Sequence, residues 1–364
     1  MCKKMKIIPV FVPHVGCPND CVFCNQKRIT GKDNIVVNGE YVKGIIEEYK
    51  KTIEDDVYTE LAFFGGSFTA IDLKLQEELL SVGKLYKDKG IIQSIRCSTR
   101  PDSIDENILN IHKKYGMDII ELGIQSLDDD VLKQSNRGHN RQQSEKASKL
   151  IKQHGFILGH QIMPGLPGSN RKSDLQTCID SIKMQPNIVR IYPTLIIKDT
   201  DLVQMYERGE YKPLTLNEAV DISALIYSYY SVNNINVIRI GLQNTENINE
   251  EKDVIAGPFH AAFRQLVEEK IYLLSLIHVL KDVDLKNKNI NIAADKKIIS
   301  YLAGQNKANI NIMKKKFSFY NISFTHSLNS QTILIYADNI KVGSILIKNI
   351  YENYLSLHQG EICI

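Results

Sequence analysis

The sequence predicts an α/β protein, with a partial (β/α)6 TIM-like barrel followed by a small C-terminal α+β domain. Two observations predict the barrel: short β-branched runs alternate with amphipathic stretches over about the first 200 residues, and the Cys-, Gly- and Ser-rich motifs all follow a run. A third observation predicts the separate domain, because the chain turns basic and rich in Lys, Asn and Ile near its C-terminal end. In parallel sheets, chemistry gathers where strands end.

The elements follow from the hydrophobic period. Strands are expected at residues 7–12, 60–64, 94–98, 119–124, 157–163 and 187–191, and helices at 41–52, 72–87, 105–115, 140–154 and 172–184. A helix at 216–232, a strand at 236–242 and a helix from Gly257 through Leu274 close the core. We therefore expect a core with its extension over 1–275, a linker over 276–291 and a small basic α+β domain over 292–364, with a helix, a turn at Gly304, a second helix and two strands.

Composition excludes several classes of protein. The chain has 364 residues, 43% hydrophobic and 24% charged, which is ordinary globular composition. No apolar run approaches the roughly 20 residues of a membrane span, and no signal-peptide core follows Met1, so a cytoplasmic protein without a membrane partner is expected. Net charge is +3, but residues 281–364 hold 11 Lys against 6 acids. This charge makes the tail a candidate for an anionic partner.

Three of the seven cysteines, Cys17, Cys21 and Cys24, lie within eight residues. A cytoplasmic compartment keeps thiols reduced, so this spacing favours a metal site over a disulfide. Three thiolates can ligate three irons of a [4Fe–4S] cluster and leave the fourth open for a ligand. The alternatives are a zinc site with His14 as fourth ligand, which lacks the usual remote ligand pair, and unrelated free thiols.

The segment Cys17-Pro-Asn-Asp-Cys-Val-Phe-Cys24, with an aromatic residue before its third cysteine, resembles the cluster loop of the radical S-adenosylmethionine (SAM) superfamily. The resemblance implies an enzyme in which the open iron binds SAM and an electron from the cluster cleaves it to a 5′-deoxyadenosyl radical. An external electron donor, such as a ferredoxin or a flavodoxin, is then a necessary partner. The protein would supply orientation and exclusion of water.

Further motifs resemble the catalytic subunit of Elongator, a family that modifies wobble uridines of tRNA. They are Thr99-Arg-Pro-Asp102, Glu121-Leu-Gly-Ile-Gln-Ser126, Asn136-Arg-Gly-His139, Ile162-Met-Pro-Gly-Leu-Pro-Gly168 and Arg190-Ile-Tyr-Pro-Thr194. The likeness extends over about residues 6 to 275. It implies cofactor contacts at Phe23, Gly65, Gly66, Ser67, Ser98, Gln125, Arg137 and Gln161, and cluster ligation by Cys17, Cys21 and Cys24.

Each assignment has a plainer alternative. Gly65-Gly66 can bring backbone groups close to the SAM amine, or can be a tight βα turn. Arg137 can grip a carboxylate, or can be a solvated surface residue. His14 and His160, which are expected near the same strand ends, are more readily explained as hydrogen-bonded structural histidines than as catalysts. Tyr192 is more readily explained as a packing residue than as a substrate contact.

The chain also departs from the Elongator pattern. Gln161 stands where Elongator-like proteins carry a His and where the coproporphyrinogen-oxidase branch carries an acid. The chain therefore departs from the family pattern at the residue expected to contact the ribose of SAM. No acetyl-CoA-binding loop is recognisable after residue 275, so acetyl transfer is not inherited from the resemblance.

The tail resembles the helix, loop, helix of a KH RNA-binding domain at Gly304-Gln-Asn-Lys307, with Lys307 in place of the second Gly and Lys314 to Lys316 following. The plainer alternative is a packing domain with a solvated Lys face. We expect a radical SAM enzyme acting on RNA, with tRNA as its substrate. Two rival functions remain open: a radical SAM enzyme acting on a small molecule such as a tetrapyrrole, and a noncatalytic iron–sulfur RNA-binding scaffold.

Overall fold

The computed structural model describes residues 5–12, 20–25, 36–54, 57–242, 252–327 and 331–358. The chain divides into two compact units. The first holds Met1–Thr215 and Ile235–Phe259, and the second holds Leu216–Asn234 and His260–Ile364. Within the described residues, no helix is long and apolar enough to cross a membrane.

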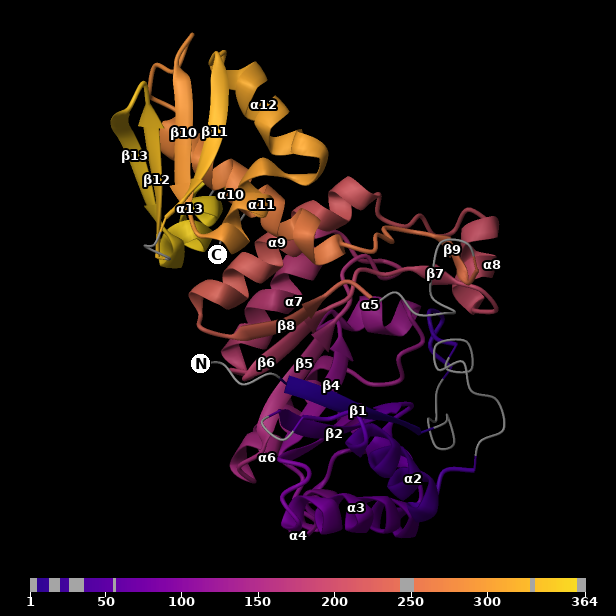
Figure 1. The fold of residues 1–364 in the computed structure, drawn as a ribbon. Coiled ribbons are helices and arrows are strands. Elements are labelled where there is room, and N and C mark those ends of the chain that lie inside the picture. Colours follow the sequence, from indigo (N-terminus) through magenta and orange to yellow (C-terminus); the bar gives the residue numbers. More distant parts are fainter. Residues whose placement is uncertain are drawn as a thin grey trace. The chain divides into compact units, whose positions relative to one another are not determined.

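The first unit is built on one curved parallel sheet of seven strands, in the order β1-β2-β3-β4-β5-β6-β8 (Figure 1). Neighbouring strands pair in parallel throughout. The six strands predicted for the barrel are confirmed, and β8 continues the sheet beyond them. The strands are β1 (Met5–Val12), β2 (Tyr58–Gly65), β3 (Ser94–Thr99), β4 (Ile119–Gln125), β5 (Ile157–Ile162), β6 (Ile188–Ile191) and β8 (Asn236–Ile240).

Helices connect successive strands and begin at predictable caps. The connecting helices are α2 (Gly39–Lys50), α3 (Leu73–Asp88), α4 (Glu106–Lys114), α5 (Asp129–Gln134), α6 (Arg141–Gln153) and α7 (Arg171–Lys183). Asp72 and Asp105 accept hydrogen bonds from first-turn amides of α3 and α4, and Asn140 and Asn170 form capping boxes on α6 and α7. Only the short α5 was not predicted, because its six residues carry too little helical periodicity.

A short arm follows β6. It consists of β7 (Ile196–Ile197), β9 (Val254–Ala256) and α8 (Asp201–Glu207), with β7 and β9 paired antiparallel. Val22 of the cysteine segment shares a small buried cluster with Ile196, Leu202 and Tyr211 of this region. The sequence did not predict the arm, since two- and three-residue strands leave no periodic signal.

The second unit is α+β. Its helices are α9 (Leu216–Val232), α10 (Phe263–Leu280), α11 (Lys296–Ala303), α12 (Ala308–Phe317) and α13 (Ile350–Ser356). Its sheet has the order β11-β10-β12-β13, formed by β10 (Asn289–Ala294), β11 (Asn321–His326), β12 (Thr332–Ala337) and β13 (Ile340–Leu346). The expected linker 276–291 contains the end of α10 and the start of β10, and the predicted domain boundaries stay a prediction.

His160 in β5 is fully buried against the helices that cover the sheet. Its ring nitrogens contact the Ser148 hydroxyl of α6 at 3.0 Å and the Ser181 hydroxyl of α7 at 2.8 Å. Burial lowers the pKa of His160 to about 3, from 6.5. The imidazole is therefore neutral in the folded protein, and it joins β5 to two helices.

The neutral His160 makes stability dependent on pH. Between pH 6.5 and about 3 the unfolded chain binds a proton at this residue that the folded chain does not, so stability falls as pH falls through this range. We expect the free energy of unfolding to drop in the wild type, relative to His160→Asn, by roughly 1.4 kcal/mol per pH unit below pH 6. Urea unfolding at pH 7, 6 and 5 measures it, and parallel pH profiles would contradict it.

Gly159, beside His160, has a packing reason to lack a side chain. A Cβ at this position would lie 2.6 Å from Cγ of Glu121, its register partner on β4. Real Cβ atoms do not approach another carbon so closely, so a larger residue would displace the Glu121 side chain.

We expect Gly159→Ala to lower the free energy of unfolding by about 1–3 kcal/mol, the usual cost of overpacking a core. Gly44→Ala is the matched control. Gly44 lies inside α2, where a Cβ would meet nothing within 4 Å, so this change should raise stability by up to about 1 kcal/mol. Chemical unfolding of both variants compares them, and equal stability of Gly159→Ala and the wild type would refute the packing argument.

Candidate functional site

A cavity of about 290 Å³ opens where the strands of the first unit end. Parallel strands bring their carboxyl ends to one edge, so loops far apart in sequence meet there. The structure brings together all the predicted cofactor-contact residues, Phe23, Gly65, Gly66, Ser67, Ser98, Gln125, Arg137 and Gln161, with the predicted cluster ligands Cys21 and Cys24 in the lining of this cavity. Cys17 and His14 lie outside the described residues.

The cysteine segment is held by hydrogen bonds to the α5–α6 loop and to the arm. The Val22 N–H donates to the Ser135 carbonyl at 3.2 Å, and the Val22 carbonyl accepts from the Leu202 N–H of α8 at 2.8 Å. The Asn136 side chain donates to the carbonyl of Asp20 at 2.7 Å. These three bonds fix residues 20–22 between the α5–α6 loop and the arm.

Arg137 reaches the cysteine segment from the α5–α6 loop. One terminal nitrogen donates to Sγ of Cys21 at 3.4 Å, and the other donates to the Gly123 carbonyl at 2.6 Å. Its Nε is buried and has no hydrogen-bond partner among the described residues. The plain alternative of a solvated surface arginine does not hold, because Arg137 is only 7% exposed.

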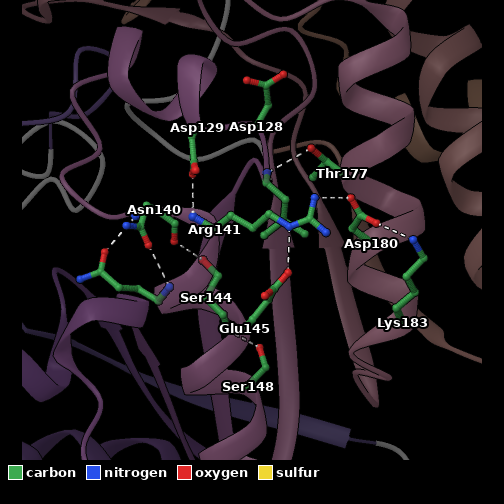
Figure 2. A network of polar contacts seen from close by, with 12 residues as sticks. Asp128, Asp129, Asn140, Arg141, Ser144, Glu145, Ser148, Thr177, Asp180 and Lys183 are labelled. Carbon is green, nitrogen blue, oxygen red and sulfur yellow. Dashed lines mark hydrogen bonds and ion pairs between the residues drawn. The ribbon is translucent and has the colours of Figure 1, made fainter.

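Arg141, the first residue of α6, anchors the end of the loop that carries Arg137, and Figure 2 shows its polar contacts. The Arg141 backbone N–H donates to Asp129 at 2.7 Å, and its guanidinium bonds Glu145 and Asp180, both at 2.8 Å. Asp180 also pairs with Lys183 of α7. The network joins α5, α6 and α7, so the loop between α5 and α6 has fixed ends.

Gly65 and Gly66 form a close approach of two strand ends, as the turn at this position requires. Gly65 has a φ of +111°, and a Cβ there would overlap the carbonyl oxygen of Val12 in β1. Beside them, the Ser67 hydroxyl lies 2.7 Å from the Thr99 hydroxyl and accepts the Arg100 N–H at 3.1 Å. Backbone and hydroxyl groups therefore line this side of the cavity.

Gln125 ends β4 in the left-handed region, with a φ of +62°. A glutamine in this conformation is uncommon, and such residues concentrate at functional sites. Its side-chain oxygen accepts from the amide of Gln161 at 3.2 Å, so the two predicted cofactor contacts interact with each other. The pair lines the cavity at the ends of β4 and β5.

Sequence reasoning missed Glu121 and misplaced His160. Glu121 also lines the cavity, and the available signal was a charged residue inside an otherwise apolar strand. His160 does not lie near the mouth, because it faces the covering helices. Its neighbour Gln161 lines the cavity instead, since successive residues of a strand alternate sides.

Comparison with known proteins identifies the family. The model of the radical SAM superfamily matches residues 11–178, and that of the radical SAM C-terminal domain matches residues 186–272. The tRNA uridine(34) acetyltransferase of Methanocaldococcus jannaschii is 29% identical over 255 residues, 59% of this chain and 47% of the relative. Elongator complex protein 3 of Saccharomyces cerevisiae is 27% identical over 267 residues, which are 62% of this chain and 47% of that relative. The chain thus spans about half the length of these curated relatives.

The fold agrees with these matches. The solved structure of archaeal Methanocaldococcus infernus Elp3, with an N-terminal deletion, superposes with a TM-score of 0.58 at 23% identity, over 74% of this chain and 63% of that one. The two family models together cover most of residues 11–272, which include every strand of the parallel sheet except the first six residues of β1. The chain therefore belongs to the radical SAM superfamily of enzymes.

Proposed function

We propose that this chain binds a [4Fe–4S] cluster on Cys17, Cys21 and Cys24, cleaves SAM, and uses the resulting radical chemistry to modify tRNA. The observation that carries the proposal is the shared cavity. Two thiols of the Cys-x3-Cys-x2-Cys segment and the Gly65–Gly66 turn lie on its wall, at the carboxyl edge of a radical SAM sheet. When bound, the cluster supplies the electron for reductive cleavage of SAM.

The residues present fit such cofactors. Thiolates are the usual ligands of iron–sulfur clusters, and neither Cys21 nor Cys24 is in a disulfide. Gly65 and Gly66 line the cavity without side chains, and the unpartnered Nε of Arg137 is a buried donor among the same lining residues. In this proposal Arg137 bonds the cysteine segment and an anionic group of the cofactor, while Gln125 and Gln161 contact its polar part.

The cysteine variants test the chemistry. We expect Cys21→Ala to abolish formation of 5′-deoxyadenosine from SAM, because a cluster with two remaining ligands is not held. Cys178→Ala, in the buried face of α7, is the matched control and should keep activity. The measurement is chromatography after anaerobic reconstitution with iron and sulfide and reduction with dithionite. Wild-type rates from Cys21→Ala would contradict the proposed ligation.

RNA as the substrate is supported by the relatives and by the second unit. The relatives named tRNA uridine(34) acetyltransferase act on a tRNA base by name, and they match the core of this chain. In the second unit, Lys314, Lys315 and Lys316 are all exposed at the end of α12. Tyr320, which is 72% exposed, follows them. Cations with a neighbouring aromatic ring suit a backbone phosphate and a stacked base.

The Gly304 turn has fewer backbone amides available for a phosphate than its KH-like sequence predicts. It lies between α11 and α12, as in the KH-like pattern, but the Gln305 N–H already donates to the carboxylate of Glu269 at 3.0 Å. The Asn309 side chain donates to the Glu269 carbonyl and the Tyr301 carbonyl at 3.0 and 2.9 Å. These bonds tie the turn to α10, so we assign the phosphate contacts to the lysines of α12 and not to this backbone amide.

Replacing Lys314, Lys315 and Lys316 with Gln should therefore weaken tRNA binding and reduce its salt dependence. Each lost phosphate contact lowers the slope of log affinity against log salt by about 1, so a change of about 2–3 is expected. The exposed Lys43, Lys50 and Lys51, in and just after α2, form the control triple and should leave the slope unchanged. Filter binding from 50 to 300 mM salt measures both, and equal slopes would contradict the assignment.

A further inference from the structure

Four buried charged side chains form a continuous ladder across the sheet of the first unit. Nη2 of Arg96 in β3 lies 2.8 Å from Glu60 in β2, and Nη1 of Arg96 lies 2.8 Å from Glu121 in β4. Glu121 in turn pairs with Arg190 in β6. Each of these side chains is at most 10% exposed, and the two acids balance the two bases.

The ladder passes over β5, which lies between β4 and β6 in the sheet. Gly159 is the residue of β5 opposite Glu121, and its missing side chain leaves the space that the Glu121 side chain fills. Any larger residue there would separate Glu121 from Arg190. The glycine at position 159 therefore allows Glu121 and Arg190 to pair across β5.

This ion pair fixes the direction of the Arg190 guanidinium. The Nε and Nη2 atoms of Arg190 both donate to Glu121, and the Cζ atom of Arg190 lies 5.5 Å from the ring centre of Phe64. Burial alone would lower the pKa of Arg190, but Glu121 and Tyr192 raise it above its usual range. Burial alone would raise the pKa of Glu121, but the charges of Arg190 and Arg96 lower it below its usual value. Both groups stay charged, and only Nη1 of Arg190 points elsewhere.

Nη1 of Arg190 points to the hydroxyl oxygen of Tyr192, at 3.2 Å. A guanidinium can only donate hydrogen bonds, so the Tyr192 oxygen accepts this one and the Tyr192 proton points away from Arg190. No acceptor for that proton occurs among the described residues, and Tyr192 lines the cavity. The ladder therefore orients Tyr192 as a hydrogen-bond donor toward a bound molecule.

We propose that Tyr192 is a specificity-determining residue that donates a hydrogen bond to an uncharged carbonyl oxygen of the substrate. The Glu121 carboxylate lines the same cavity and the ladder has no excess positive charge, so this wall disfavours a phosphate or a carboxylate. The inference rests on the proposed function, which makes the acceptor a carbonyl oxygen of a uracil base in RNA. A half-buried donor held in one orientation disfavours a base that cannot accept from it.

The test combines Tyr192→Phe with a change in the RNA. The probes are an anticodon stem–loop with uridine at the wobble position and two matched RNAs in which sulfur, a weaker acceptor, replaces the oxygen at C2 or at C4. We measure KM and kcat for RNA-dependent formation of 5′-deoxyadenosine, and the KM for SAM, with the reconstituted holoenzyme. Tyr86→Phe is the matched control, because its hydroxyl donates to Glu47 at 2.6 Å and Tyr86 is not in the cavity lining.

We expect Tyr192→Phe to raise KM for the uridine RNA about tenfold, since an acceptor is left unpaired, with an unchanged KM for SAM. The wild type and Tyr86→Phe should discriminate against one of the two thio-RNAs, and Tyr192→Phe should not. Unchanged KM and discrimination in Tyr192→Phe would overturn this inference alone, as would a rise in KM for SAM instead of RNA. If no RNA stimulates cleavage by the wild type, the RNA substrate and this inference both fall.

Discussion

The parallel pairing of seven strands is the constraint on which the rest of this structure depends. Because every strand of the sheet runs the same way, the cysteine segment, the glycine turn after β2 and the polar ends of β4 and β5 meet at one edge. Backbone hydrogen bonds of the strands cannot change register without moving side chains to the other face. The sheet therefore fixes which strand ends meet at this edge.

Two polar systems convert that constraint into a defined site. On one side, Arg141 ties α5, α6 and α7 together, so that Arg137 and Asn136 reach the cysteine segment from a loop with fixed ends. On the other side, the ladder from Glu60 to Arg190 crosses the sheet and ends at Tyr192. The first system positions the cysteine segment. The second leaves an oriented hydroxyl on the cavity wall. Each system leaves one donor, Nε of Arg137 and the hydroxyl of Tyr192, without a hydrogen-bond acceptor among the described residues.

Most of the core was predictable from sequence because its signals are local. The β-branched runs and the Asp and Asn caps gave the six strands and five of the helices close to their observed bounds. The residues that the resemblance implies as cofactor contacts all lie in the cavity lining. What the sequence did not show depends on contacts between distant residues. The role of Glu121 requires knowing that Gly159 stands beside it, and the burial of His160 requires knowing that Ser148 and Ser181 face it.

Electron paramagnetic resonance of the anaerobically reconstituted protein tests the central claim most directly, namely that the cysteine segment and the cavity form one site for a cluster and SAM. The account predicts one [4Fe–4S] cluster per chain, with a spectrum of the reduced state that changes when SAM is added, and loss of that cluster in Cys24→Ala. A spectrum indifferent to SAM, or a cluster that survives Cys24→Ala, would contradict it.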